Sequence, residues 1–323
     1  MIRFLMLAFV TVVCAPTFFP LVVLADDGAA QKAVLVTGAS SGIGLKITEK
    51  LASNGFHVYA GARKAADLER LDAMENVSSI RLDVTVQEEI DAAVEFVKDQ
   101  GRGLFGVVNN AGVGSISSLA TGPESDMDFI FGVNVYGPYR INKAFLPFLD
   151  ESDGRTTTIG SVSGFIARKA GIYSMSKFAV EAYTDSLALE IAGNGVHVSI
   201  VEPGTFKSGF AVSQAARALA AADKGDIELT AEERTRYEGV SVRNATRKEP
   251  DEVADAVLDL MTAENPKRRY MVTANERQAQ AAIKAAMRRL VQLNHDQPYN
   301  YDRDGLIAVL DELLAEISNA TGN

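Results

Sequence analysis

The chain contains few of the residues that form disulfides or bind metals. It has a single cysteine, Cys14, so no internal disulfide can form and no cysteine-rich metal site exists. Its three histidines, His57, His197 and His295, lie far apart and lack the spacing of metal ligands. We therefore predict no metal centre and interpret the histidines as ordinary strand or surface residues.

Positive charge is also scarce. The chain has 32 lysines and arginines against 42 aspartates and glutamates, which gives a net charge of −10. An acidic chain lacks the basic stripe that binds nucleic-acid phosphates, which argues against a nucleic-acid partner. The 323 residues, 47% hydrophobic and 23% charged, suffice for one large α/β domain or two small ones.

Charge is absent altogether from residues 4–24, which follow Arg3. This run is long enough for a bilayer span of about 20 residues. Val23-Leu24-Ala25 before Asp26 also suits a signal-peptide cleavage site. Residues 1–25 are therefore interpreted as a membrane anchor or an export signal, with the N-terminus held on the cytoplasmic side by Arg3. A mis-assigned start codon would instead leave the protein cytoplasmic.

From Lys32 onward the hydrophobic pattern alternates between strands and helices. Helices are predicted at 43–52, 65–74, 88–98, 126–149, 173–192 and 251–261. Strands are predicted at 33–37, 56–60, 80–84, 106–109, 156–159, 196–201 and 269–272. Repeated β-α-β units predict an α/β fold with a doubly wound parallel sheet of the Rossmann type. Ligands then bind at the carboxyl ends of the strands.

The alternation stops after Pro203. The Ala-rich stretch at about 205–250 is interpreted as a small helical lid within a domain at 32–275. Residues 276–323 form a C-terminal helical extension, with a basic helix predicted at 276–293 and an amphipathic helix at 306–317. The basic helix could meet a membrane surface or a partner subunit, or present a solvated face.

Three glycines stand between the first predicted strand and the first predicted helix. They follow the spacing G-x-x-x-G-x-G. Gly38 permits a tight turn, Gly42 lets the backbone approach a pyrophosphate, and Gly44 lets helix and strand pack closely. The sequence therefore predicts a nucleotide-phosphate site formed by Gly38, Ser40, Ser41, Gly42, Ile43 and Gly44.

The end of the second predicted strand carries a cation. An acidic residue at this point would bind the ribose 2′-hydroxyl of NAD. Here Arg63 is followed by Lys64, and no carboxylate appears before Asp67. Because a guanidinium fits a 2′-phosphate, the sequence favours NADP over NAD. The alternative is a solvated basic pair.

Tyr173 and Lys177 are four residues apart, which places them on one face of a helix. An ammonium group beside a phenol is predicted to lower the phenol pKa from about 10. Such a tyrosine can transfer a proton near neutral pH. Ser161, after the strand that ends at Ile159, would present a hydroxyl beside the phenol.

Together these motifs resemble the short-chain dehydrogenase/reductase family over roughly residues 32–272. The motifs that carry the resemblance occur in the family's order: TGASSGIG at 37–44, Asp83-Val84, Asn109-Asn110-Ala111-Gly112, Asn134, Ser161, Tyr173-x-x-x-Lys177 and Pro203-Gly204. The stretches 201–206 and 266–270 are similar to the branch with retinol and 17β-hydroxysteroid dehydrogenases, which often handles large apolar alcohols. Gly160 stands where the family usually has another serine.

The resemblance implies a cofactor role for residues after several strands. Asp83 and Val84 would flank the adenine. Asn110, Ala111 and Gly112 would line the cofactor after the fourth strand. Pro203, Gly204 and Thr205 would pack near the nicotinamide.

The resemblance also implies a catalytic role for four residues. Tyr173 would protonate the alkoxide that forms when NADPH delivers hydride to a carbonyl carbon. Ser161 would hydrogen-bond that oxygen, and Lys177 would hold the ribose and depress the pKa of Tyr173. Asn134 would hold a water in a proton relay to Lys177.

The predicted function is that of an NADP-dependent oxidoreductase interconverting an alcohol and a carbonyl on an apolar substrate of retinoid, steroid or acyl-chain type. Phe165, Ile166, Phe206 and Phe210 could line an apolar pocket or pack in the core. A non-catalytic NADP-binding sensor or scaffold is the alternative, and it would typically lose Tyr173, Lys177 or Ser161. An epimerase or dehydratase relative would usually carry G-x-x-G-x-x-G instead. In the family that this chain resembles, the helix that holds Tyr173 and the long helix before it often build dimer interfaces, so we expect a homo-oligomer.

Overall fold

The computed structural model describes residues 31–167 and 171–321. The apolar segment predicted at residues 1–25 lies outside these ranges, so its interpretation as an anchor or export signal stays a prediction. Among the residues that are described, no helix is both long enough and apolar enough to cross a membrane.

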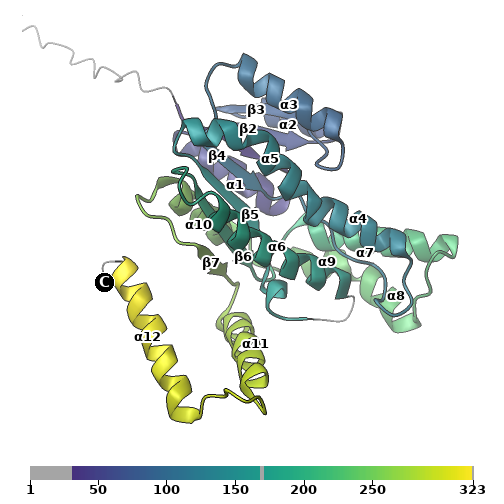
Figure 1. Ribbon diagram of the computed structural model, residues 1–323. Helices are drawn as coiled ribbons and strands as arrows, with labels where there is room; N and C mark the ends of the chain where they lie inside the picture. The colour runs from purple at the N-terminus through teal and green to yellow at the C-terminus, as the bar shows by residue number, and fades with distance from the viewer. Residues whose placement is uncertain (1–30, 168–170, 322–323) are drawn as a thin grey trace, which may run out of the picture. The chain divides into compact units, whose positions relative to one another are not determined.

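A seven-stranded parallel sheet forms the centre of the domain (Figure 1). The strand order is β3-β2-β1-β4-β5-β6-β7, and every neighbouring pair is parallel. The strands are β1 (Ala33–Val36), β2 (His57–Ala62), β3 (Val77–Arg81), β4 (Gly106–Asn109), β5 (Arg155–Ile159), β6 (His197–Pro203) and β7 (Arg269–Val272). The order reverses between β1 and β4, which is where ligands bind in such sheets. The predicted doubly wound parallel fold is confirmed.

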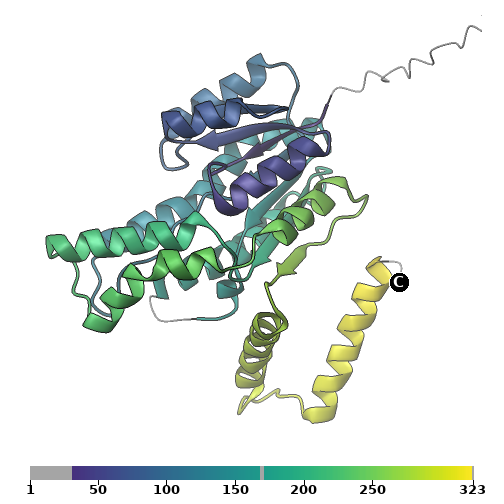
Figure 2. The same ribbon diagram turned by 180° about the vertical axis from the view of Figure 1, so that it is seen from behind.

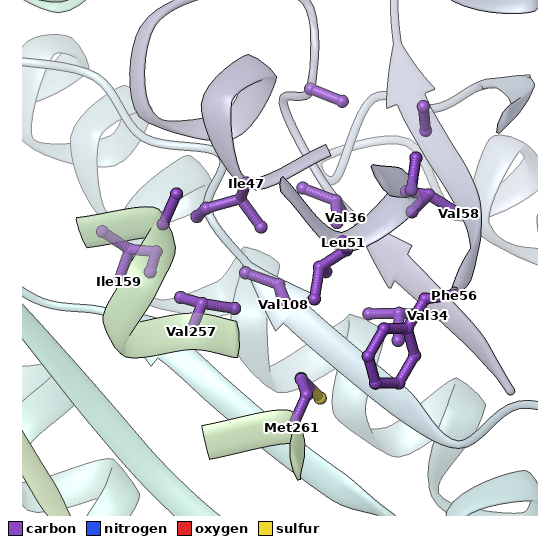
Figure 3. Close-up of a cluster of buried hydrophobic side chains, with 14 of the residues drawn as sticks. Val34, Val36, Ile47, Leu51, Phe56, Val58, Val108, Ile159, Val257 and Met261 are labelled. Carbon is purple, nitrogen blue, oxygen red and sulfur yellow. The ribbon is translucent and has the colours of Figure 1, made fainter. Parts of the chain in front are cut away.

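Helices cover both faces of this sheet, and β1 is apolar at every position. Val34 and Val36 pack on one face, in a cluster with residues of α1 (Gly42–Ser53) and α10 (Asp251–Thr262) (Figure 3). Leu35 points to the other face, in a cluster with residues of α3 (Gln87–Asp99), α5 (Tyr136–Glu151) and α6 (Gly171–Glu190). Burial on two faces explains the continuous apolar run in place of alternation.

The third strand differs from the prediction at 80–84. It is β3 (Val77–Arg81), and it lies three residues earlier. Leu82 makes the last ladder bond, to Ala62, and Asp83 donates its backbone N–H to the Glu89 carboxylate instead of to a strand. Val84 is buried in the second cluster from a loop position, so its apolar character reflects packing and not pairing.

The single helix predicted at 126–149 is two helices, α4 (Glu124–Asn134) and α5, with a break at Val135. Pro138 lies in the first turn of α5 and has no N–H to donate to the Asn134 carbonyl, four residues earlier. That carbonyl is therefore released from the helical ladder just where α4 ends.

The remaining elements follow the sheet or connect its strands. They are α2 (Ala65–Asp72), a 3₁₀ turn η1 (Val162–Gly164), α7 (Gly209–Lys224), α8 (Ala231–Glu238), α9 (Val240–Ala245), α11 (Glu276–Asn294) and α12 (Arg303–Thr321). Helices α7 to α9 occupy the stretch predicted as a lid. Helices α11 and α12 follow β7 and are joined by a short turn (Figures 1 and 2). We call α11, α12 and that turn the C-terminal hairpin.

Candidate active site

The glycine turn after β1 is fastened to the end of β4 by one amide side chain. Asn110 Nδ2 donates to the carbonyls of Thr37 and Gly38, at 2.9 and 3.0 Å. Thr37 Oγ1 accepts in return from the backbone N–H groups of Asn110 and Ala111, both at 3.0 Å. Two motifs that lie more than 70 residues apart are thus joined at the reversal point of the sheet.

This turn fits the phosphates of a dinucleotide. Gly38 and Gly42 have φ angles of +65° and +56°, in the left-handed region that favours glycine. A Cβ on Gly44 would lie 2.3 Å from both Asn110 Nδ2 and the Gly38 carbonyl oxygen. Ser41 caps α1 without a side-chain bond, and the first turn holds no acidic residue. The first amides of α1 are therefore open to an anion.

The cation predicted to select NADP lies directly after β2. Arg63 is 60% exposed at its side chain and forms an ion pair with Asp83, with 3.2 Å between Nη1 and Oδ2. Burial tends to raise the pKa of Asp83, but hydrogen bonds from Thr85 and Arg63 outweigh it and lower the pKa. Arg81 Nη1 donates to the Arg63 carbonyl at 2.7 Å. The segment after β2, which carries Arg63, is thereby joined to the end of β3 and to the segment after it, which carries Asp83.

A second cation reaches the glycine turn from α2. Arg70 Nη2 donates to the Ser40 carbonyl at 2.5 Å and pairs with Asp67 at 3.2 Å. Arg70 was not among the residues predicted from the sequence, since nothing in the helical pattern indicates that this exposed side chain reaches the glycine turn after β1.

Ser161 and Tyr173, which were predicted to meet, lie close enough for the Ser161 hydroxyl to lower the pKa of the Tyr173 phenol, although burial raises that pKa more. Ser161 follows β5 and caps η1, where its Oγ accepts the backbone N–H of Ser163 at 3.1 Å. Tyr173 lies in the first turn of α6. The short turn η1 thus sets the serine hydroxyl against the phenol.

Lys177 lies one helical turn after Tyr173 and is only 5% exposed. Its Nζ donates to the Ile159 carbonyl at 2.7 Å and lies 5.8 Å from the centre of the Tyr173 ring. Burial lowers the pKa of Lys177 to about 8, and the nearby Glu181 carboxylate acts in the opposite direction.

The prediction that Lys177 lowers the pKa of Tyr173 is wrong for this structure. Burial raises the pKa of the Tyr173 phenol to about 12, and the Ser161 hydroxyl only partly opposes that rise. The physical reason is that the buried ammonium is directed to the Ile159 carbonyl, so it does not offset the loss of solvent around the phenol.

Asn134 is almost fully buried at the end of α4. Its Oδ1 accepts the N–H of Val113 at 2.8 Å, and its Nδ2 donates to the Val113 carbonyl and to Ser176 Oγ, both at 3.0 Å. A Cβ on Gly112 would lie 3.5 Å from Asn134 Oδ1 and 4.0 Å from Lys177 Nζ. Asn134 therefore positions the loop after β4 beside the lysine, and its part in a proton relay stays a prediction.

The segment after β6 contacts the C-terminal hairpin. Gly204 donates its N–H to the Val272 carbonyl at 2.7 Å, and Thr205 donates its N–H to Gln278 Oε1 at 2.7 Å. Gln278 belongs to α11, which the family resemblance left outside the common core. Its contact with Thr205 was not foreseen, because it depends on how the chain turns after β7.

The stretch predicted as a lid places α7 next to the predicted site residues. A Cβ on Gly42 would lie 2.8 Å from the Cβ of Ser208, and the Phe210 ring centre lies 5.2 Å from that of Tyr173. Arg217 donates to the Gly114 carbonyl at 3.0 Å and pairs with the buried Asp126 at 3.4 Å. Helix α7 is thus tied to the loop after β4.

The four apolar residues considered for a pocket lie in different places. Phe206 is buried in the first core cluster, so the core interpretation holds for it. Phe165 lines a groove beside α11 and α12. Ile166 is half-buried, and its carbonyl accepts from Ser174. Only Phe210 is in ring contact with Tyr173.

A pair of buried carboxyl groups lies between α6 and β6, one helical turn beyond Lys177. Glu202 on β6 is 1% exposed and Glu181 on α6 is 8% exposed. Both approach one guanidinium, that of Arg269, at 3.6 and 3.4 Å, while Asp185 takes its closest contact at 2.8 Å. Burial raises the pKa of Glu181 to about 7 and that of Glu202 to about 8. This pair was not predicted from the sequence, because only the packing of α6 on β6 brings the two carboxyl groups together.

Comparison with known protein families gives a match over residues 32–218, to the family described as short chain dehydrogenase. The matched range contains the glycine turn, Ser161, Tyr173 and Lys177.

Three curated relatives illustrate the range of similar proteins. The chain is 34% identical over 247 residues to the uncharacterized oxidoreductase YbbO of Escherichia coli, covering 75% of this chain and 86% of that protein. It is 35% identical over 265 residues to the mitochondrial D-beta-hydroxybutyrate dehydrogenase of Rattus norvegicus, covering 76% and 77%. It is 38% identical over 181 residues to retinol dehydrogenase 5 of Homo sapiens, covering 54% and 57%.

Among solved structures, a short-chain dehydrogenase from Streptomyces avermitilis superposes with a TM-score of 0.65 at 26% identity, over 81% of this chain and 93% of that one. The similarity thus extends to the arrangement of the sheet and its helices.

We predict that Gly44→Ala weakens binding of the nicotinamide cofactor by about tenfold or more. The new Cβ would overlap Asn110 Nδ2 and the Gly38 carbonyl, and overpacking of this kind costs about 1–3 kcal/mol. Calorimetric titration with NADPH measures the effect. Gly193→Ala is the matched control, because no atom lies within 4 Å of its Cβ position. Equal affinities for the two variants would contradict the tight fit of the turn.

We predict that Glu202→Gln makes the protein more stable than the wild type at pH 9 but not at pH 4.5. The pKa of Glu202 in the folded protein is raised to about 8. Between the ordinary glutamate pKa of about 4.3 and pH 8, the folded state keeps a proton that the unfolded chain releases. The stability of the wild type therefore falls as the pH rises through this range. Glutamine cannot ionise, so the melting temperature at pH 9 should rise by a few degrees. The exposed Glu264→Gln serves as the control, and the same rise at both pH values would speak against the assignment.

Proposed function

Since the chain belongs to the short chain dehydrogenase family, and so is an NAD(P)-dependent oxidoreductase acting on alcohols and carbonyls, we propose that it uses NADP and that Tyr173, Ser161 and Lys177 carry the chemistry. The observation that carries this proposal is the approach of the Ser161 hydroxyl to the Tyr173 phenol, with Lys177 one turn further along α6. The three groups lie on elements that follow strands at the carboxyl edge of the sheet.

The nicotinamide cofactor supplies or accepts the hydride when it is bound. The open amides at the start of α1 would hold its pyrophosphate. The absence of a side chain at Gly44 lets the glycine turn pack closely against Asn110 at the end of β4. Gly112 lies next to Asn134 and Lys177, in a loop that can approach a ligand because it carries no side chain there.

In this proposal Tyr173 is the proton donor for carbonyl reduction. A phenol with a pKa of about 12 is protonated at neutral pH, so it starts each reduction in the form that can give its proton away. Ser161 fixes the direction of the phenol and adds a second hydroxyl for the substrate oxygen. Lys177, with a pKa of about 8, is mostly charged at pH 7 and would bind the cofactor's hydroxyl groups.

Support for NADP comes from the charge at the end of β2. Arg63 is exposed and able to receive an anion while it still touches Asp83. The residue that follows, Lys64, is exposed as well, and no carboxylate precedes Asp67. A doubly charged 2′-phosphate would gain more from this pair than a ribose hydroxyl would.

Support for an apolar substrate comes from the side of the site that α7 covers. Phe210 provides an aromatic surface beside Tyr173. A small carboxylate substrate would need a free cation there, and the nearest one on α7, Arg217, is paired with Asp126. The arrangement therefore favours an apolar alcohol such as retinol, named in the retinol dehydrogenase relative, over a small hydroxy acid such as hydroxybutyrate, named in the D-beta-hydroxybutyrate dehydrogenase relative.

We expect Tyr173→Phe to reduce kcat for carbonyl reduction by about 10³-fold, because general acid catalysis contributes about 10²–10⁴-fold. NADPH binding should be retained. Tyr183→Phe is the matched control on the same helix, where the lost hydroxyl only accepts a bond from Asn142. The assay follows NADPH oxidation against a panel of apolar aldehydes and ketones. Near-normal turnover by Tyr173→Phe would refute the catalytic assignment.

Arg63→Ala should lower kcat/KM for NADPH by about 10- to 100-fold and leave kcat/KM for NADH nearly unchanged. A hydrogen bond to a charged group contributes about 1.5–3 kcal/mol, and only NADPH carries the 2′-phosphate. Initial rates with each cofactor give the ratio directly, and Lys98→Ala on the exposed face of α3 controls for loss of one positive charge. Equal losses with both cofactors would show that Arg63 does not read the 2′-phosphate.

A further inference from the structure

The C-terminal hairpin leaves an unusual number of large apolar side chains in solvent. Of the 21 such residues that are exposed in the described chain, 12 lie between residues 283 and 317. Single exposed leucines are ordinary, but a concentration of this kind marks an interaction surface.

Helix α11 uses one side to pack on the domain and leaves another uncovered. On the packed side Ala282 is buried, and the Arg289 guanidinium lies 4.1 Å from the centre of the Phe178 ring. On the uncovered side Ile283, Met287 and Leu290 recur at helical spacing and are all about half exposed. The docked side fixes which way the uncovered side faces.

Helix α12 also leaves apolar side chains uncovered. Its start is held by paired bonds across the turn, where Asn294 Nδ2 donates to the Tyr301 carbonyl at 2.8 Å and Tyr301 N donates to Asn294 Oδ1 at 2.9 Å. Leu310, Leu313 and Leu314 then stand exposed at spacings of three and four residues.

An apolar groove of about 520 Å³ lies between the two helices and Phe165 of the domain. Its apolar walls are Phe165, Ala286, Leu290, Leu293, Leu306 and Val309. Phe165 directly follows η1, the turn that begins after Ser161. The groove therefore joins the uncovered helix faces to the neighbourhood of the catalytic serine.

The two helices carry opposite charge. Helix α11 has four cations and one carboxylate, for a net charge of +3: Glu276, Arg277, Lys284, Arg288 and Arg289. Helix α12 has one cation and four carboxylates, for a net charge of −3: Arg303, Asp304, Asp311, Glu312 and Glu316.

These charges border the apolar faces. Lys284 follows Ile283, and Arg288 follows Met287, so both lie one residue beyond the uncovered side of α11. Asp311 follows Leu310 in the same way on α12. In the described part of the chain neither Lys284, Arg288, Asp311 nor Glu316 belongs to an ion pair.

We propose that the C-terminal hairpin is an interface with a second copy of this chain, in which α11 of each copy packs against α12 of the other. A two-fold axis makes this contact twice, so each +3 helix meets a −3 helix while the apolar faces close on each other. The result is a four-helix bundle in which opposite charges flank an apolar seam.

A lipid surface fits these faces less well. Helices that lie on anionic membranes carry lysine and arginine beside their apolar face. Helix α12 places carboxylates there instead, so a membrane that attracts α11 would repel α12.

The test uses two charge-reversed full-length variants. The first carries Lys284→Glu and Arg288→Glu, which makes both helices acidic. The second carries Asp311→Lys and Glu316→Lys, which makes α12 basic beside a basic α11. Like charges then face each other in each variant alone, while opposite charges face each other in a mixture of the two.

Sedimentation velocity measures the mass of each sample. We expect each variant alone to sediment at half the wild-type mass and an equimolar mixture to recover the wild-type mass. The control is Glu75→Lys with Glu264→Lys, which changes the net charge as the second variant does but lies outside the hairpin, and it should keep the wild-type mass. Recovery in the mixture also shows that both variants are folded.

Two results would overturn the proposal. One is an unchanged mass for both variants, or a mixture that stays at half mass. The other is flotation of the wild-type chain as a monomer with phosphatidylcholine–phosphatidylglycerol vesicles, with weaker flotation of the first variant and stronger flotation of the second. That pattern would assign the hairpin to a membrane surface.

Discussion

Burial of two ionisable groups on one turn of α6 is the constraint on which the rest of the site depends. Loss of solvent raises the pKa of the Tyr173 phenol to about 12 and lowers the pKa of the Lys177 ammonium to about 8. Both shifts have the same origin, since a low-dielectric environment penalises whichever form is charged. Ser161 and the Ile159 carbonyl are the partners that make this burial tolerable.

The carboxyl edge of the sheet brings these groups to the glycine turn. Asn110 ties β4 to the turn after β1, Asn134 fixes the loop after β4, and the break before Pro138 places Asn134 at a helix end. The proposed chemistry follows from this scaffold. Lys177 is held by a main-chain carbonyl and Ser161 by a short turn, which serves the precise orientation that hydride transfer requires.

Features that depend on residues close together in the sequence could be predicted from the sequence. The glycine spacing, the strand pattern and the Tyr173–Lys177 interval indicated the fold and the meeting of Ser161 with Tyr173. The break near Val135 had a visible signal in Pro138 that the helical pattern concealed. Long-range packing decided the rest: no spacing rule could show that Lys177 turns to the Ile159 carbonyl, that Glu181 faces Glu202, or that Gln278 reaches Thr205. Through Gln278 the C-terminal hairpin is part of the site's surroundings and not a separate appendage.

The protonation state of Tyr173 decides whether this residue can be the proton donor. Carbon-13 NMR of protein labelled at tyrosine Cζ reports each phenol, and the spectrum of a variant that lacks this tyrosine identifies its resonance. We expect the Tyr173 resonance to keep the shift of a neutral phenol from pH 6 to pH 10, because the pKa of Tyr173 is about 12. A titration midpoint near pH 7 would contradict this, since about half of the Tyr173 phenols would then be phenolate at neutral pH and unable to begin reduction as the proton donor.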